Sequence, residues 1–307
     1  MEGQEFLTEY RSISNKLKKR FLRRPNVSEA SDHFRQLGRK LEEAEEPQYA
    51  AFCHLATSRC EQTVGNSPAE IDATTAAART FLKAEMEVQS LGNPSFEEQL
   101  TAASASYSHA ARLQQEAGRD QMAAYLLLEL AEALVNLHRP VQALPVFQRA
   151  SKLLEGHTQE YLRAKLRIAD CYIATPDHHN ALLVLSEVHN FAVEHDACNL
   201  YGDLLENVEI LRVLLLLIIQ PSQHNTSPQL LDVLDRYRGT EAEELPAKPS
   251  PYLDLETSLL LQSVVLAVEG EGETEALLYL EDELAPRLSD QQRRLLRIIV
   301  AATMSRV

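Results

Sequence analysis

The chain has 307 residues, of which 45% are hydrophobic and 10 are glycine, and its formal net charge is −15. This apolar fraction is enough for a large packed core, which excludes wholesale disorder. Few glycines disfavour all-β folds and nucleotide-binding α/β folds, because both use glycine in tight turns. The acidic balance disfavours nucleic-acid binding, which needs a positive surface.

The cysteines and the first residues indicate a cellular compartment. Four cysteines are too sparse for a disulfide framework, so we expect reduced thiols. The first ten residues contain no apolar leader, and neither end carries a lipidation motif. We therefore expect a soluble, cytoplasmic protein.

The first predicted element is a basic amphipathic helix within residues 1–24, ended by Pro25. Apolar residues spaced by three or four positions place one apolar stripe along it. They are Phe6, Tyr10, Ile13, Leu17 and Phe21. Seven basic and three acidic residues give this segment a net charge of +4. Its basic run consists of Lys16, Lys18, Lys19, Arg20, Arg23 and Arg24.

That basic run has several interpretations. An apolar face beside a charged rim is typical of a helix that docks on a protein partner. The run is also compatible with contact to anionic lipid or with a nuclear localisation signal. Alternatively, it forms a solvated helix edge or pairs with acids of the same chain.

Residues 25–220 are predicted to form helix pairs, with helices of about 15–20 residues joined by short loops. Breaks are expected at 91–94, 118–120, 138–140, 155–157 and 175–177, each of which contains Gly or Pro. Ser-x-x-Glu/Gln signatures begin at Ser67, Ser95 and Ser289 and predict capped helix starts there. No run alternates like a strand, so the predicted fold class is all-α.

A triplet with spacing zero, four and seven recurs in this region, as 103/107/110, 143/147/150 and 181/185/188. Small residues there let two helices approach closely, while an aromatic or Leu fills the groove between helix pairs. The pattern is that of tetratricopeptide helix pairs, although its period is longer than usual and the characteristic Trp is absent. We predict a tetratricopeptide-like solenoid, with an irregular Ala-packed bundle as the alternative.

The most hydrophobic stretch is 208–219, VEILRVLLLLII. It is shorter than the roughly 18–20 residues that cross a bilayer, and Arg212 interrupts it. A helix apolar all round is expected to be buried on several sides, either in the core or beneath a partner.

The C-terminal part, 226–307, contains a Pro-rich acidic loop near 240–251 and predicted helices near 253–268, 273–284 and 289–303. We expect it to continue one solenoid that spans 1–307. Its acidic residues cluster at Glu269, Glu271, Glu273, Glu275, Glu281, Asp282 and Glu283. A basic start and an acidic end suit the orientation of a partner.

No catalytic or metal-binding motif is present in the sequence. It lacks a phosphate-binding glycine loop, a nucleophile elbow and a helical pair of zinc ligands. Cys53 and Cys60 share a helical face and are expected to be buried small hydrophobes. We therefore expect a non-enzymatic protein without cofactor or metal.

Residues 6–30, FLTEYRSISNKLKKRFLRRPNVSEA, resemble the N-terminal signature of the huntingtin-associated proteins of forty kilodaltons, the factor VIII intron 22 protein family. Segments 49–62, 212–221, 258–267 and 291–303 resemble the same family in the same order, so the resemblance covers most of the chain. Vertebrate members begin with a Gly/Ala-rich tail and carry a Pro-rich insert before the Leu-rich helix. This sequence has neither.

The resemblance implies a helical solenoid that forms a stable complex with huntingtin, clasped between that partner's helical-repeat lobes. It also implies recruitment of huntingtin to early endosomes through a Rab-type GTPase, with altered vesicle motility. Early endosomes and the nucleus are then further expected locations beside the cytoplasm.

We expect both charged ends to bind the partner. Phe6, Tyr10, Leu17 and Phe21 are the expected anchors, with the basic run as their rim. The acidic cluster is expected to face a basic region and to steer association. The alternative is a membrane-trafficking adaptor that resembles vesicle-fusion attachment proteins and meets anionic lipid through the basic helix.

Overall fold

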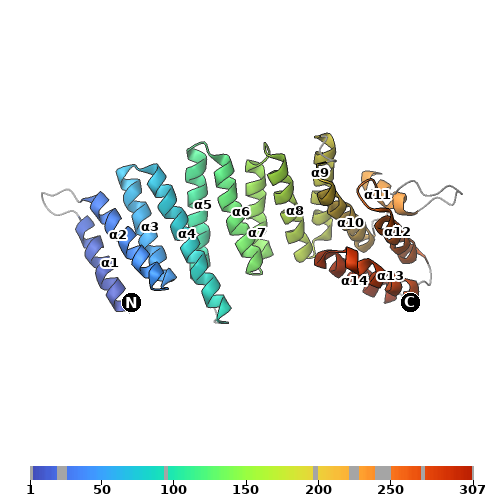
Figure 1. Ribbon diagram of the computed structural model, residues 1–307, viewed down its shortest axis with the longest axis horizontal. Helices are drawn as coiled ribbons and strands as arrows, with labels where there is room; N and C mark the ends of the chain where they lie inside the picture. Colours follow the sequence, from blue (N-terminus) through green and yellow to red (C-terminus); the bar gives the residue numbers. More distant parts are fainter. Residues whose placement is uncertain are drawn as a thin grey trace. The chain divides into compact units, whose positions relative to one another are not determined.

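The computed structural model describes residues 3–18, 26–92, 96–195, 200–220, 228–238, 250–270 and 274–305. Within these residues the chain forms fourteen α-helices and one short 3-10 helix, and no strand (Figure 1). The predicted all-α helical solenoid is confirmed, because helices pack on helices in chain order. Contacts divide the chain into two compact units, residues 1–164 and 165–307. The predicted single body over 1–307 stays a prediction.

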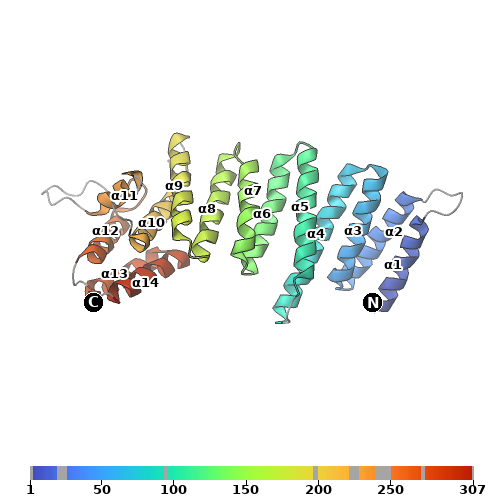
Figure 2. The ribbon, with the colours of Figure 1, turned by 180° about the vertical axis from the view of Figure 1, so that it is seen from behind.

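Unit 1 is a row of helices in which each packs against the next one along the chain (Figures 1 and 2). Its helices are α1 (Gly3–Leu17), α2 (Val27–Glu43), α3 (Pro47–Val64), α4 (Ser67–Ser90), α5 (Glu98–Glu116), α6 (Asp120–Asn136) and α7 (Pro140–Leu153). The start of α8 (Thr158–Ala174) also belongs to it, since Ala164 packs with Ala124 and Leu154.

All three predicted triplets are buried between helices, those at 103/107/110 and 143/147/150 in unit 1 and that at 181/185/188 in unit 2. Ala143, Phe147 and Ala150 of α7 are all fully buried, and the members of the other two triplets are too. Their small side chains allow close approach of the helices, and the larger central residue fills the remaining space. The five predicted breaks also coincide with helix ends.

One predicted cap differs from the structure. Helix α4 begins at Ser67 itself, and Asn66 occupies the capping position. Glu70 does not close a capping box there, because its carboxylate accepts a hydrogen bond from Gln62 at 3.0 Å.

The second predicted cap, Ser95, lies outside the described residues, and α5 begins only at Glu98. Glu97 precedes it with a left-handed φ of 60° and pairs with Arg139 at 2.5 Å. The third cap is confirmed, since Ser289 and Gln292 form a capping box.

Unit 2 is organised around one buried helix. Its helices are the rest of α8, then α9 (His178–Glu194), α10 (Gly202–Ile219), α11 (Pro228–Arg238), α12 (Leu255–Glu269), α13 (Thr274–Leu284) and α14 (Asp290–Met304). Helix α10 packs against α9, α11, α12 and α14. The Leu-rich stretch therefore lies in the core of unit 2, as predicted.

Arg212 is a charged residue in the apolar helix α10, and the helix continues through it without a break. Arg212 is 4% exposed and lies 3.3 Å from the carboxylate of Glu209, which is fully buried. Arg236 of α11 approaches the same carboxylate at 3.2 Å, and the Tyr237 hydroxyl lies 3.5 Å from it. The two guanidinium groups balance a charge that would otherwise be costly to bury.

Candidate interaction surfaces

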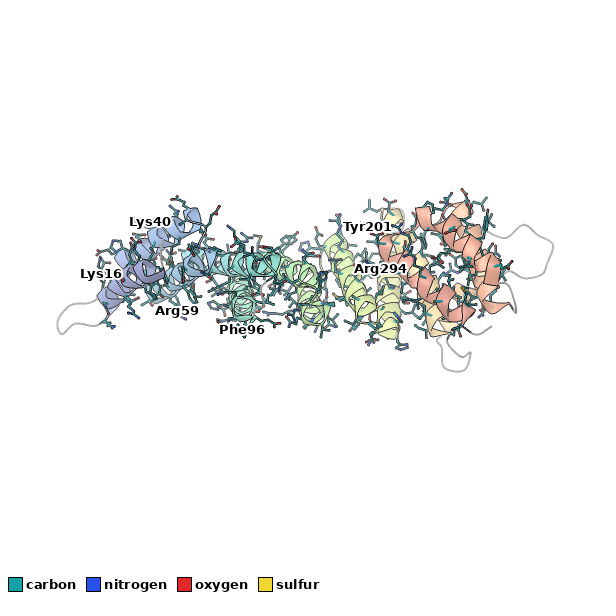
Figure 3. The ribbon with its side chains drawn as sticks, turned by 90° about the horizontal axis from the view of Figure 1, so that it is seen from below. Lys16, Lys40, Arg59, Phe96, Tyr201 and Arg294 are labelled. Atoms are coloured by element: carbon teal, nitrogen blue, oxygen red, sulfur yellow. The ribbon has the colours of Figure 1, made fainter. Side chains whose placement is uncertain are left out.

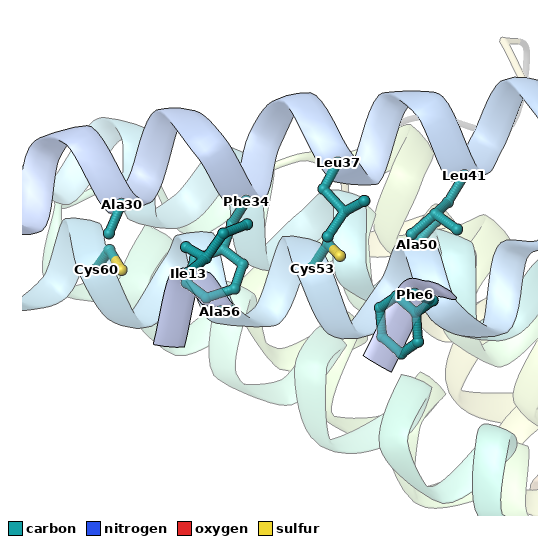
Figure 4. Packing of buried hydrophobic residues seen from close by; sticks show 10 residues of the cluster. All are labelled: Phe6, Ile13, Ala30, Phe34, Leu37, Leu41, Ala50, Cys53, Ala56 and Cys60. Carbon is teal, nitrogen blue, oxygen red and sulfur yellow. The ribbon is translucent and has the colours of Figure 1, made fainter. Parts of the chain in front are cut away.

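The apolar stripe of α1 packs inside unit 1. Phe6 is 4% exposed, and its ring stacks on Tyr49 of α3 with centroids 4.7 Å apart. Tyr10 contacts Phe34 of α2 at a centroid distance of 5.1 Å, and Ile13 is buried as well. Figure 4 shows Phe6 and Ile13 lying against the α2–α3 pair. In this arrangement Phe6 contributes to the core rather than to the surface.

The other predicted N-terminal residues have different positions. Tyr10 and Leu17 are only partly buried against this core cluster. Lys16 and Lys18 are exposed, and neither forms an ion pair with any described carboxylate. The remaining members lie outside the described residues: Lys19, Arg20, Phe21, Arg23 and Arg24. That these residues anchor a partner stays a prediction.

A groove lies between α1 and α3 at the end where α1 stops. Its volume is about 340 Å³, and Leu17, Val27, Phe34 and Ala56 supply its apolar lining. Arg59 of α3 lies at the same groove, is exposed, and pairs with no carboxylate among the described residues. Figure 3 marks Lys16 and Arg59 in this N-terminal part of the unit. The groove therefore combines an apolar lining with Arg59, a cation that no described carboxylate pairs.

Burial favours the neutral form of the phenol and thiol groups at this groove and beside it. Burial and the nearby Cys53 raise the pKa of Tyr10, while the positive charge of Arg59 opposes that shift. Burial and then Glu61 raise the pKa of the Cys60 thiol, and burial raises the pKa of Cys53 to about 12. Both thiols are protonated at neutral pH, and a protonated thiol is a poor nucleophile.

A second groove of unit 1 lies over α4, α5 and α6 and has a volume of about 600 Å³. Arg79 of α4 forms a two-pronged ion pair with Glu129 of α6, with N–O distances of 2.7 and 2.8 Å. The Tyr107 hydroxyl donates to the same carboxylate at 2.8 Å. Leu82 and the exposed Met86 complete an apolar strip beside this pair.

The acidic cluster of unit 2 is partly paired within the chain. Glu269 accepts hydrogen bonds from Arg238 at 2.7 and 3.0 Å, and Glu281 lies 3.3 Å from Arg297. Because these arginines are distant from the acidic residues in sequence, the acidic run alone does not predict the ion pairs.

Three members of the cluster remain exposed on α13: Glu275, Asp282 and Glu283. Two others, Glu271 and Glu273, lie outside the described residues. The accessible negative charge of this helix is therefore smaller than the sequence run indicates.

Sequence reasoning missed several exposed apolar residues. Phe96 is 91% exposed in the α4–α5 connection and is marked in Figure 3. The sequence motif that contains Phe96 is the Ser-x-x-Glu signature at Ser95, which predicts a helix cap and not an exposed apolar side chain. On α12, Leu255, Leu259 and Leu266 are between 41% and 59% exposed, at positions that share one helical side. Exposed apolar residues at helical spacing are typical of contact surfaces.

Two further properties concern membranes and metals. Among the described helices, none combines the length and the apolar character needed to cross a bilayer. Within the same residues, no group of three or more His, Cys, Asp or Glu side chains is arranged to hold a metal ion.

Comparison with known proteins identifies the family. No protein-family model matches the chain. It is 34% identical over 359 aligned positions to the 40-kDa huntingtin-associated protein of rat, and equally to that of mouse. Each alignment covers 99% of this chain and 94% of the relative. The chain belongs to the family of the 40-kDa huntingtin-associated protein. The resemblance that began at residues 6–30 is thereby confirmed for the whole chain.

The alignment also shows a difference within the family. It is longer than the 307 residues of this chain, so the rat and mouse relatives hold segments that this chain lacks. The two units nevertheless lie within the aligned region, because nearly all of the chain is covered. The helices described above are thus the part that this chain shares with them.

Proposed function

We propose that this protein is a non-enzymatic binding partner of huntingtin and forms a stable complex with it. The observation that carries the proposal is the 34% identity to relatives named for huntingtin association, over 99% of the chain. The described residues are consistent with such a role, since they offer two grooves and several exposed apolar side chains.

Co-expression tests the proposal directly. The full chain is produced alone and together with huntingtin, and solubility and co-elution in size-exclusion chromatography are measured. We expect one stable complex that elutes ahead of either protein. A soluble chain that elutes separately from huntingtin at micromolar concentration would contradict the proposal.

The acidic surface of α13 is proposed to steer this association. Exposed charges of one sign mainly raise the association rate, and salt screens their effect. The variant with Glu275→Gln, Asp282→Asn and Glu283→Gln should therefore associate about tenfold more slowly at low salt and depend less on salt.

A matched control variant neutralises three exposed acids elsewhere: Glu43→Gln, Glu155→Gln and Glu194→Gln. It changes the net charge by the same amount and should associate faster than the α13 variant. Equal rates for the two variants would mean that α13 has no special part in steering. Such a result would leave the complex itself unaffected.

The family likeness extends the proposal to the cell. We propose that the complex assembles in the cytoplasm, is recruited to early endosomes through a Rab-type GTPase, and alters vesicle motility. Imaging of the tagged chain with an endosomal marker, with and without huntingtin, tests this extension. Endosomal signal that persists without huntingtin would point to another recruitment route.

The adaptor alternative rests on Lys16 and Lys18, which are exposed without ion pairs among the described residues. A helix that lies on a membrane also needs an exposed apolar face. In α1 that face is packed on α2 and α3, with Phe6 and Ile13 buried. We therefore favour a protein partner, and flotation of the full chain with anionic vesicles separates the two functions.

A further inference from the structure

We propose that the groove between α1 and α3 receives an acidic segment of a protein partner, with a carboxylate on Arg59 and an apolar side chain in the groove. The inference rests on the proposed function and names the chemistry of one contact. It assigns a role to Arg59, which no sequence motif singled out.

The groove can hold one apolar side chain together with neighbouring main chain. Its volume of about 340 Å³ exceeds that of any single side chain, and Leu17, Val27 and Ala56 lie along it. The rings of Tyr10 and Phe34 belong to the same lining and contact each other in a tilted arrangement, with centroids 5.1 Å apart. Filling such a groove removes apolar surface from water on both partners.

Arg59 supplies a positive charge that no carboxylate among the described residues neutralises. Arg35 on α2 shows the usual arrangement, since it pairs with Asp32 at 2.9 Å and with Glu61 at 3.0 Å. Glu61 is only two residues after Arg59 but turns to Arg35 and Ser31 instead. No described carboxylate lies within ion-pair distance of Arg59. Lys16 and Lys18 add two further unpaired cations next to Leu17.

A carboxylate is the group that completes this site. An arginine fork binds a carboxylate in two-pronged geometry, and the bond strengthens where water is partly excluded. Ser14 in the lining offers a hydroxyl group for the main chain of the same segment. The Thr63 hydroxyl donates to the Arg59 carbonyl at 2.8 Å and can still accept a hydrogen bond from a main-chain N–H. The site therefore fits an Asp or Glu close in sequence to an apolar residue.

A polypeptide fits this groove better than a bilayer does. The apolar surface here is concave, so a flat lipid surface would reach only its rim. On the described helix α1, the apolar face that would insert into lipid is packed within unit 1, since Phe6 and Ile13 are 4% and 5% exposed. Cations around a recessed apolar floor are thus arranged for an acidic side chain that protrudes from a partner.

The test measures binding of full-length variants to purified huntingtin. Arg59→Glu should weaken binding by about thirtyfold or more and Arg59→Gln by about tenfold, because a charge-assisted hydrogen bond is lost. Thr63→Trp places an indole at the rim and should weaken binding by about tenfold with the charge intact.

Arg149→Glu is the matched control, since Arg149 is an exposed arginine of α7 that pairs with no described carboxylate. This variant should bind within about twofold of wild type.

Two readouts separate binding from folding. The thermal midpoint of each variant should equal that of wild type, because Arg59 and Thr63 are exposed and make no ion pair. The affinity of wild type should fall with salt more steeply than that of Arg59→Gln. Equal midpoints show that weaker binding does not come from unfolding, and the reduced salt dependence supports a contact at Arg59.

The outcomes are distinct. Wild type that does not bind huntingtin overturns the proposed function and this inference with it. Wild type that binds, together with Arg59→Glu and Thr63→Trp variants of unchanged affinity, overturns this inference alone. If Arg59→Glu keeps huntingtin but loses flotation with phosphatidylserine vesicles, the groove is a lipid site and the inference is wrong.

Discussion

Glu61 in unit 1 and Glu209 in unit 2 are both buried carboxylates, 8% and 0% exposed, yet their surroundings differ. Glu61 lies near the end of α3 and accepts bonds from the Ser31 hydroxyl at 2.5 Å and from the Asn66 amide at 2.9 Å. Arg35 adds one charged donor at 3.0 Å. Most of its partners are therefore neutral groups close by.

Glu209 lies in the middle of a Leu-rich helix and depends on two arginines, at 3.2 and 3.3 Å. One of them, Arg212, is itself buried and keeps an unpaired Nε. A carboxylate near a helix end, such as Glu61, can be satisfied by neutral donors of an adjacent helix and of the next helix cap. One inside a packed helix needs opposite charge, and that charge has its own desolvation cost.

The largest expected effect tests this dependence on charge. Glu209→Ala leaves the Arg212 guanidinium buried without its carboxylate and should destabilise unit 2 by about 3–5 kcal/mol. Replacing both with leucine should cost less than about 1 kcal/mol, because no buried charge remains. Urea unfolding followed by circular dichroism measures both. Equal losses for the single and double variants would show that packing rather than charge holds this site.

The corresponding change in unit 1 should be milder. Glu61→Gln keeps a carbonyl acceptor for the Ser31 hydroxyl but places an NH2 group opposite the donating Asn66 amide, while Arg35 can still pair with Asp32. We expect a loss of about 1–2 kcal/mol in the same unfolding assay. A loss as large as that of Glu209→Ala would remove the distinction between the two sites.

A smaller effect on stability is expected when the half-exposed arginine beside each buried carboxylate is replaced. The side chains of Arg35 and Arg236 are 38% and 37% exposed, so water screens both to a similar degree. Arg35→Gln should cost no more than about 1 kcal/mol, since Glu61 keeps its neutral donors. Arg236→Gln should cost more, because only Arg212 then opposes the Glu209 charge. Reversal of this order in thermal unfolding would contradict the comparison.

The smallest effect concerns pH. Burial and then the Arg212 charge lower the pKa of His189 below its ordinary 6.5; Arg236 acts in the same direction, while Asn190 and Glu209 oppose it. The unfolded chain therefore binds more protons below pH 6.5, and stability should fall as pH decreases from 6.5 toward the lowered folded pKa. His189→Gln should flatten this part of the profile by at most about 1.4 kcal/mol per pH unit. Urea titrations at several pH values measure it, and an unchanged slope would mean that His189 is not responsible.

Much of the fold was predictable because local signals and packing agree. The triplets at 103, 143 and 181, the five Gly- or Pro-containing breaks and the Ser289 capping box each appear in the structure as predicted. Helix periodicity and capping depend on residues within a few positions of one another, so the sequence displays them directly. The cap predicted at Ser67 lies one residue too late, because Asn66 occupies the capping position.

The surfaces were less predictable because they depend on distant residues. The apolar stripe of α1 indicated a contact face, and only the arrangement of Tyr49 and Phe34 shows that unit 1 itself provides that contact. Arg59 is a single arginine in an otherwise ordinary helix, and three helices must meet before its groove exists. Likewise Arg238 neutralises Glu269 across 31 residues of sequence.

The contact of α14 with α10 has a consequence for synthesis of the protein. The helices of unit 1 meet their neighbours as soon as each leaves the ribosome, which favours folding during translation. Unit 2 cannot complete its packing until α14 has been synthesised, since Gln292 of α14 donates to Asn207 of α10 at 2.8 Å across 85 residues. Until α14 emerges, one side of the Leu-rich helix is uncovered. A premature stop codon before Asp290 should therefore expose that side permanently and direct the chain to chaperones and proteolysis.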